Sequence, residues 1–225
     1  MKMRKMRTKT RLTTMGKNKS TDRRERGLLL VISGPAGSGK GTVIAELMKK
    51  DDRYCYSVSA TTRAPRPGEV NGVNYHFITR EDFTERISGG GMLEYTEYCG
   101  NLYGTPRREA EEALKNGRNL ILEIEVKGAE NIKKIFPEAV LIMLLPPSFA
   151  VQEKRLRGRG TETEEKINAR LERTKEEIKQ YKLYDYIVYN EDGGAEKTAE
   201  DLRAIVRAEK LRTERNEGAD KRYFE

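Results

Sequence analysis

The chain has 225 residues, which is long enough to bury one sizeable core with or without inserts. Hydrophobic and charged residues each make up 36% and the formal net charge is +8, which excludes a chain that is disordered throughout and indicates a heavily charged surface. No apolar run approaches the roughly 18 residues of a membrane span, so we expect no membrane contact. Two cysteines, Cys55 and Cys99, are too few for the disulfide framework of a secreted protein, so we expect a cytoplasmic location.

The basic character belongs to residues 1–26. This segment holds 11 Lys and Arg against Asp22 and Glu25, whereas the remainder carries 33 basic and 34 acidic residues. We interpret it as a disordered basic tail, and Met15 is a candidate for the true start. An arm that contacts nucleic acid or another acidic surface is the alternative. Its lack of an apolar segment excludes a secretory signal, while its Arg-rich, acid-poor start leaves an organellar transit peptide open.

After the tail, apolar strand-like runs alternate with helical patterns. Strands are expected at 28–33, 55–59, 73–78, 92–98, 119–125, 139–145 and 185–190. Helices are expected at 40–50, 80–88, 106–116, 127–135, 148–157, 163–181 and 194–213. This alternation predicts an α/β fold with a mostly parallel core sheet flanked by helices.

The composition of the strands separates a core from an insert. The run at 28–33 is apolar throughout, as in strands buried on both faces, whereas 92–98 is mixed, as in a small half-exposed sheet. Residues 59–105 are therefore expected to form an insert with short strands of its own. Thr105 and Pro106 predict the N-cap and first position of the helix that follows.

A glycine-rich segment connects the first strand to the first helix. It reads Gly34-Pro35-Ala36-Gly37-Ser38-Gly39-Lys40-Gly41-Thr42. In this context the glycines let backbone N–H groups turn toward phosphate oxygens, and the helix N-terminus adds partial positive charge. The usual pattern has Ser or Thr after the lysine, but here the hydroxyl comes one residue later, on Thr42. The segment predicts a nucleoside triphosphate site, with a plain helix-capping turn as the alternative.

The next informative segment is a loop stiffened by Pro65 and Pro67. It carries Arg63 and Arg66, whose planar guanidinium groups match phosphate oxygens in two-pronged fashion. Prolines lower the entropy lost when such a loop is held in one shape. Taken alone, two surface arginines indicate a solvated loop. Beside a phosphate loop, they predict a second phosphate site that faces the first.

Residues 59–75 resemble the acceptor-site signature of the guanylate kinases. The matching string is Thr61-Thr62-Arg63-x-Pro65-Arg66-x-Gly68-Glu69-x-x-Gly72-x-x-Tyr75, and the resemblance runs from about Leu28 to about Arg212. It implies phosphorylation of GMP, and of dGMP, to GDP with ATP as donor, in purine nucleotide metabolism. It also implies that the GMP phosphate is held by Arg63, Arg66, Tyr75 and Tyr103, and the guanine by Ser59, Glu94, Thr105 and Glu125.

The chemistry of guanine supports this assignment. Its N1–H and 2-amino groups are adjacent donors, and one carboxylate at Glu94 can accept from both. Hydroxyl groups such as those of Ser59 and Thr105 can serve O6 or N7. Adenine lacks the paired donors and would leave a buried carboxylate without partners, which is how large discrimination arises.

The resemblance also assigns the donor side. Glu123 and Glu125 end an apolar strand where the family often has two aspartates, and Glu123 is expected to hold Mg²⁺, through water. Residues 155–170 resemble the lid of the family, whose arginines close on the transferring phosphates. With Lys40, the expected catalytic residues are thus Arg155, Arg159 and Arg170. Arg157 has no matching role and is expected to be solvated, and Asn190 matches a position near the adenine of ATP.

The domain is expected to span residues 27–215, followed by a polar tail at 216–225.

Two other functions are possible alternatives to the kinase. A non-catalytic scaffold domain of the same fold would bind partner peptides and have a degraded phosphate loop, whereas this loop keeps its glycines and Lys40. A kinase with a ribose-phosphate acceptor would not need Glu94, Ser59 and Thr105 together. The sequence does not indicate an oligomeric state.

Overall fold

The computed structural model describes residues 26–98, 100–158, 160 and 162–224. Within them, a five-stranded sheet has the order β2-β7-β1-β8-β9, and every pairing is parallel. The strands are β1 (Leu29–Ser33), β2 (Tyr54–Tyr56), β7 (Asn119–Glu123), β8 (Val140–Leu145) and β9 (Tyr186–Tyr189). The prediction of an α/β fold with a mostly parallel core sheet is confirmed.

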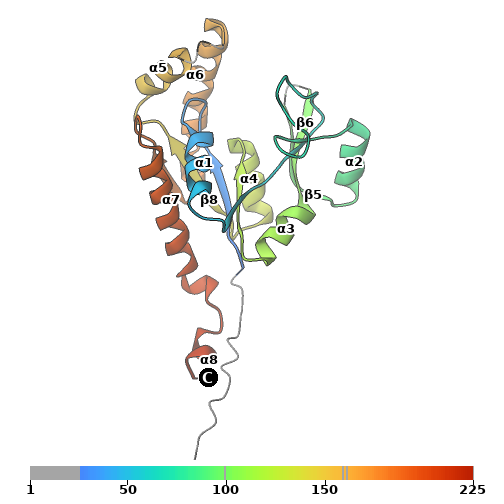
Figure 1. The fold of residues 1–225 in the computed structure, drawn as a ribbon, viewed down its shortest axis with the longest axis vertical. Coiled ribbons are helices and arrows are strands. Elements are labelled where there is room, and N and C mark those ends of the chain that lie inside the picture. The colour runs from blue at the N-terminus through green and yellow to red at the C-terminus, as the bar shows by residue number, and fades with distance from the viewer. Residues whose placement is uncertain (1–25, 99, 159, 161, 225) are drawn as a thin grey trace, which may run out of the picture.

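Helices cover both faces of this sheet (Figure 1). Leu30 and Ile32 of β1 pack with α1 (Lys40–Lys49) and α7 (Ala195–Lys210). The alternate residues, Leu29 and Val31, pack with α3 (Arg107–Lys115) and α4 (Val126–Ile135). All residues of β1 and β8 are buried, because a central parallel strand has an apolar layer on each side.

A second sheet, built from residues 60–106, lies to one side of the first (Figure 1). Its strands are β4 (His76–Phe77), β3 (Ala60–Thr61), β6 (Asn101–Pro106) and β5 (Met92–Tyr98), in that spatial order. The helix α2 (Arg80–Ser88) seals it with Phe83, which packs on Ala60, Met92 and Leu102. We call this unit the insert.

The structure corrects several expected boundaries in this region. The strand expected at 55–59 ends at Tyr56, and β3 starts separately at Ala60. The strand β6 was not predicted at all. Thr105 lies in β6 and does not cap α3, whose N-cap is Pro106 with no side-chain hydrogen bond. The reason is that the Thr105 hydroxyl serves a buried carboxylate on β5.

Two helices, α5 (Phe149–Gly158) and α6 (Glu164–Ile178), stand beyond the carboxyl end of the core sheet (Figure 1). Leu156, Ile167 and Leu171 hold them together and pack on Ala36. The helix expected at 163–181 ends at Ile178, and a short 3-10 helix, η1 (Tyr181–Leu183), follows.

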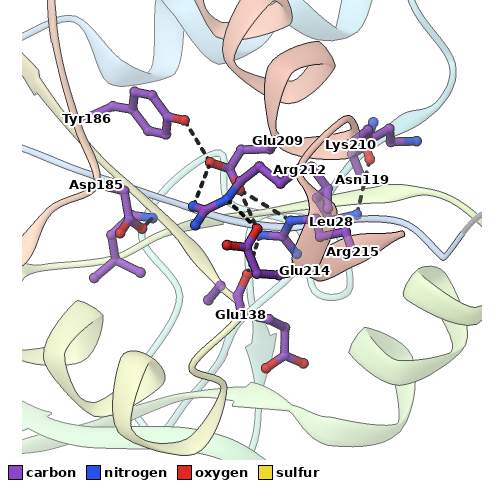
Figure 2. Close-up of polar contacts among 12 residues, drawn as sticks. Leu28, Asn119, Glu138, Asp185, Tyr186, Glu209, Lys210, Arg212, Glu214 and Arg215 are labelled. Carbon is purple, nitrogen blue, oxygen red and sulfur yellow. Dashed lines mark hydrogen bonds and ion pairs between the residues drawn. The ribbon is translucent and has the colours of Figure 1, made fainter. Parts of the chain in front are cut away.

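The C-terminal region closes the opposite end of the sheet. A 3-10 helix, η2 (Thr213–Arg215), follows α7, and the polar segment expected after residue 215 contains a short helix, α8 (Ala219–Phe224). Figure 2 shows the buried Glu209 of α7 surrounded by Tyr186, Arg212 and Arg215. Across the described residues, we find no helix with the length and apolar character that a bilayer crossing requires. The tail of residues 1–26 falls outside the description except for Arg26.

Candidate functional site

The glycine-rich segment forms a loop whose shape depends on particular glycines. Gly34, Gly37 and Gly39 have φ of 147°, 85° and 88°. A Cβ on Gly34 would lie 2.0 Å from the carbonyl oxygen of Leu144, and one on Gly39 would lie 2.3 Å from Nδ2 of Asn190. Both positions therefore exclude any side chain. Lys40 Nζ donates to the carbonyls of Gly34 at 2.7 Å and Pro35 at 3.2 Å, so its charge lies inside the loop.

Two amides from distant elements support the loop. Asn190 Nδ2 donates to the Ser38 carbonyl at 2.9 Å, and Gln152 Nε2 donates to the Ala36 carbonyl at 2.8 Å. Both side chains are buried. Asn190 thus supports the loop from behind, and Gln152, which the sequence reasoning missed, joins the loop to α5. The Ser38 hydroxyl is buried without a hydrogen-bond partner among the described residues.

A surface hollow of about 540 Å³ adjoins the loop and is lined by Gly39, Thr42, Arg155 and Asn190. Arg155 Nη2 donates to the Asn190 carbonyl at 2.8 Å and to Asp192 Oδ1 at 2.7 Å. The structure thus brings Arg155 and Asn190 to the phosphate loop, while their expected roles at the transferring phosphates and near the adenine stay predictions. Asp192, which holds the guanidinium, was not predicted.

The other described arginines of the predicted lid pair with carboxylates of α5, of α6 and of the segment between them. Arg170 Nε donates to Glu162 Oε2 at 2.7 Å, and its side chain is 49% exposed. Arg157 pairs with Glu153 and Glu164 and is partly exposed, in keeping with a solvated residue. Arg159 lies outside the described residues. In this structure the Arg170 guanidinium is therefore held by a carboxylate of the lid.

The predicted acceptor arginines are organised by a carboxylate. Arg63 Nη2 donates to both oxygens of Glu69, at 2.8 and 2.9 Å, and the backbone N–H of Arg66 donates to Glu69 Oε2 at 2.7 Å. The Arg63 guanidinium also lies 5.5 Å from the centre of the Tyr75 ring. Glu69 belongs to the matching string, which assigns it no role; its position three residues after Arg66 is the sequence signal for this contact.

The aromatic side chains of the insert complete this region. The rings of Tyr75 and Tyr103 meet edge to face with centres 6.1 Å apart. Burial raises the pKa of Tyr75, which keeps its hydroxyl protonated and able to donate. Ser59, half-buried, precedes β3, and its carbonyl accepts from the backbone N–H of His76. Arg63, Tyr75 and Tyr103 therefore form one donor-rich group.

Glu94 is the buried charge of the insert. It is 6% exposed, and the Thr105 hydroxyl donates to its Oε1 at 2.9 Å across the β5–β6 pair. Burial raises its pKa to about 7, and the hydrogen bonds from Thr105 offset only part of that shift. Glu94 and Thr105 are thus in direct contact, and their predicted role in binding guanine stays a prediction.

The two glutamates at the end of β7 have separate partners. Glu123 Oε2 accepts from the Tyr56 hydroxyl at 3.4 Å, and Glu125, the N-cap of α4, accepts from Arg173 of α6 at 2.5 Å. The described residues contain no cluster of three or more His, Cys, Asp or Glu able to hold a metal. Mg²⁺ usually keeps several waters and binds through one or two carboxylates together with substrate phosphates, so the carboxylate of Glu123 is chemically suited to such an ion.

A parallel sheet with a glycine loop after its central strand, and an insert carrying ordered arginines and a buried carboxylate, defines a nucleotide kinase of the phosphate-loop class. The guanylate kinase family model matches residues 26–209. The chain belongs to the guanylate kinase family.

Individual relatives cover most of the chain. It is 53% identical over 192 residues to a guanylate kinase of Halalkalibacterium halodurans, covering 85% of this chain and 93% of the relative. It is 49% identical over 191 residues to a guanylate kinase of Clostridioides difficile, covering 85% and 92%. A crystal structure of guanylate kinase from Anaplasma phagocytophilum superimposes with a TM-score of 0.67 at 34% identity, covering 84% and 89%.

Proposed function

We propose that this chain transfers the γ-phosphoryl group of ATP to GMP, giving ADP and GDP, and that it accepts dGMP as well. The observation that carries the proposal is the Glu94–Thr105 pair, a buried carboxylate and hydroxyl on the same insert as Arg63. Guanine offers the two adjacent donors that such a carboxylate requires. A phosphate loop on the core sheet supplies the donor side.

The donor nucleotide binds to residues 34–42. Backbone N–H groups and the buried Ser38 hydroxyl donate to phosphate oxygens. Lys40 gives up its hydrogen bonds to the loop carbonyls and binds the terminal phosphates instead. Asn190 acts from behind by holding the Ser38 carbonyl, and Arg155 borders the hollow beside the loop. Bound Mg²⁺ would supply charge neutralisation between the phosphates, with Glu123 holding one of its waters.

The acceptor nucleotide binds in the insert. Arg63, Arg66, Tyr75 and Tyr103 hold its phosphate, and Glu69 holds the Arg63 guanidinium and the Arg66 backbone N–H before the ligand arrives. Ser59, Glu94, Thr105 and Glu125 read the base. In the free protein, Nη2 of Arg63 donates to Glu69 and Nη1 donates to the Ala64 carbonyl, so a ligand phosphate shares the guanidinium with these two acceptors.

Transfer needs the two sites brought together. The insert and the pair α5–α6 lie on different sides of the sheet end that carries the phosphate loop (Figure 1). Within the domain of residues 27–215, closure of the lid, residues 155–170, and of the insert on the core would place the phosphates in line and exclude water. Lys40, Arg155, Arg159 and Arg170 then neutralise the transferring charge, and no covalent intermediate is required.

The direct test is to incubate the protein with Mg·ATP and each nucleoside monophosphate in turn and to follow ADP release. Turnover with GMP and dGMP, and little with AMP or UMP, is expected. No turnover with GMP, or equal turnover with AMP and UMP, would reject the proposal.

We further propose a cytoplasmic enzyme whose basic tail is dispensable for catalysis. A form that starts near Arg26 should therefore keep the activity, and a large loss of activity would contradict this.

The acceptor assignment has its own test. Replacing Arg63 by Ala removes a charge-assisted contact with the GMP phosphate, and such contacts contribute about 1.5–3 kcal/mol. We expect the KM for GMP to rise about 10- to 100-fold while the KM for ATP changes little. Arg80→Ala is the matched control, because Arg80 is an insert arginine that pairs with Glu97 at the surface. An unchanged KM for GMP in Arg63→Ala would contradict the assignment.

A further inference from the structure

Arg173, on α6, binds two carboxylates that belong to different parts of the molecule. Its Nη2 donates to Glu125 Oε2 at 2.5 Å, and its Nε lies 2.8 Å from Glu177 Oε1. Glu177 is on the same helix, whereas Glu125 is the N-cap of α4, 48 residues earlier in the chain. Burial raises the pKa of Glu177, and the charge of Arg173 opposes that rise. The pair therefore connects a lid helix to the core.

The helix that Glu125 caps leads directly to the insert. Ala129 and Ile132 of α4 pack in one buried cluster with Leu93 of β5. Glu94 is the next residue along that strand. The carboxylate held by Arg173 thus starts the helix against which the base-reading strand is packed.

We propose that Arg173 is a positioning residue for the acceptor base, acting through Glu125. The inference rests on the proposed function, in which Glu125 accepts from guanine. Arg173 occupies Oε2 of Glu125 and leaves Oε1 for the 2-amino group of the base. A half-exposed glutamate samples many rotamers, and a guanidinium fixed at its other end by Glu177 removes that freedom. The same contact makes the position of α6 depend on the acceptor site.

Arg157 provides the contrast. It also binds two carboxylates, but both belong to the lid helices: Glu153 lies on α5 and Glu164 on α6. Its charge pairing stays within the lid helices, with no link to the base-reading residues. Arg157→Ala thus matches Arg173→Ala in charge, size and region while leaving Glu125 held.

The test compares Arg173→Ala, Arg173→Lys and Arg157→Ala in the full chain. Kinetic constants are measured with GMP and with IMP, whose base lacks the 2-amino group, and GMP binding is measured by calorimetry without ATP. In Arg173→Ala we expect the KM and the dissociation constant for GMP to rise about tenfold, the size of one lost charge-assisted contact. The KM for ATP should change less than about twofold, since only the acceptor site is altered. The preference for GMP over IMP should fall.

The remaining variants separate positioning from plain structural support. Arg173→Lys keeps the charge but not the planar fork, so it should restore part of the GMP affinity. In a double variant, adding Arg173→Ala to Glu125→Ala should cause no further loss of GMP affinity, because the two residues act through one contact. Additive losses, equal changes in both KM values, or similar behaviour of Arg173→Ala and Arg157→Ala would overturn the inference. If Arg173→Ala fails to fold, Arg173→Gln and Arg173→Lys carry the same comparison.

The two proposals fail in different ways. A wild-type chain that does not phosphorylate GMP contradicts the proposed function. A wild-type chain that does, together with an unchanged GMP affinity in Arg173→Ala, contradicts the role of Arg173 alone.

Discussion

Glu94 is the carboxyl group that we propose accepts hydrogen bonds from the guanine edge, and only its ionised form can accept from both donors of the base. Burial raises its pKa to about 7, so near neutral pH the free protein contains both forms. The protonated form offers one acceptor fewer and presents a proton to the donors of the base. Binding of GMP is therefore expected to release a proton in that pH range.

This predicts a pH-dependent affinity for the acceptor. The KM for GMP should rise as the pH is lowered through about 7, because the carboxylate form is lost, while the KM for ATP should follow no such step. Steady-state kinetics in buffers on either side of that pH measure both constants. Glu94→Gln should abolish the step and show weak GMP binding at every pH. A GMP constant that is flat across this range would contradict the prediction.

The same shift has a consequence for stability, with a definite sign. The folded pKa of Glu94 lies above its ordinary value of 4.5, so the favourable contribution of the protonated form is complete below 4.5 and is lost as the pH rises through about 7. A shift of this size corresponds to on the order of 3 kcal/mol. Urea unfolding should show Glu94→Gln gaining stability relative to wild type as the pH rises from about 5 to about 8. A constant difference would show that Glu94 titrates normally.

At the scale of elements, the phosphate loop depends on side chains far away in the sequence. The Asn190 amide donates to the Ser38 carbonyl, and Asn190 itself follows the edge strand β9. Asn190→Ala removes this buried bond, and we expect a loss of about 1–3 kcal/mol in stability together with a higher KM for ATP. Thermal unfolding and kinetics measure the two effects. Asn216→Ala is the control, since Asn216 also donates to backbone carbonyls but lies after α7.

Elements with a strong local pattern could be predicted from the sequence, and those that depend on pairing could not. The apolar runs of β1 and β8 and the loop between β1 and α1 stand within a residue or two of their expected places. The strand β6 was missed because Asn101–Pro106 alternates weakly and contains Gly104. It is a strand because its antiparallel pairing with β5 puts Thr105 beside Glu94 and Gly104 under Phe83.

The site divides in the same way. The string around Arg63 and Arg66 predicts residues that would contact a ligand through their own side chains. Glu69, Gln152 and Arg173 support other residues through hydrogen bonds, and only the packing of separate elements shows which residues they contact. A sequence motif predicts the atoms that meet a ligand, whereas the support behind them follows from the tertiary structure.

At the scale of the whole molecule, the core sheet has chemistry at one end and a buried ion cluster at the other. Glu209 is 2% exposed at its side chain and accepts from the Tyr186 hydroxyl at 2.6 Å and from Arg215 at 2.9 Å (Figure 2). Arg215 also donates to the carbonyl of Glu138, just before β8. Tyr186 and Glu138 mark the amino ends of β9 and β8, whereas the phosphate loop follows the carboxyl end of β1. The cluster therefore fastens α7 to the sheet without approaching the nucleotide site.

Although burial alone would raise the pKa of Glu209, the hydrogen bonds from Tyr186 and Arg215 together hold it below its ordinary value of 4.5. Arg215→Ala should lower the free energy of unfolding by about 2 kcal/mol, or Tm by about 4–8 °C, at neutral pH. Because a depressed carboxyl pKa stabilises above 4.5, the difference from wild type should shrink as the pH falls through the folded pKa of Glu209.

Two further measurements make the prediction specific to this cluster. The KM values for ATP and GMP of folded Arg215→Ala should equal those of wild type, because the cluster lies at the far end of the sheet. Arg207→Ala, which removes an exposed arginine from the same helix, should leave Tm within about 1–2 °C, as surface substitutions do. An Arg215→Ala protein with unchanged Tm, or with altered KM values at unchanged stability, would mean that the cluster does not hold α7 to the sheet as the geometry implies.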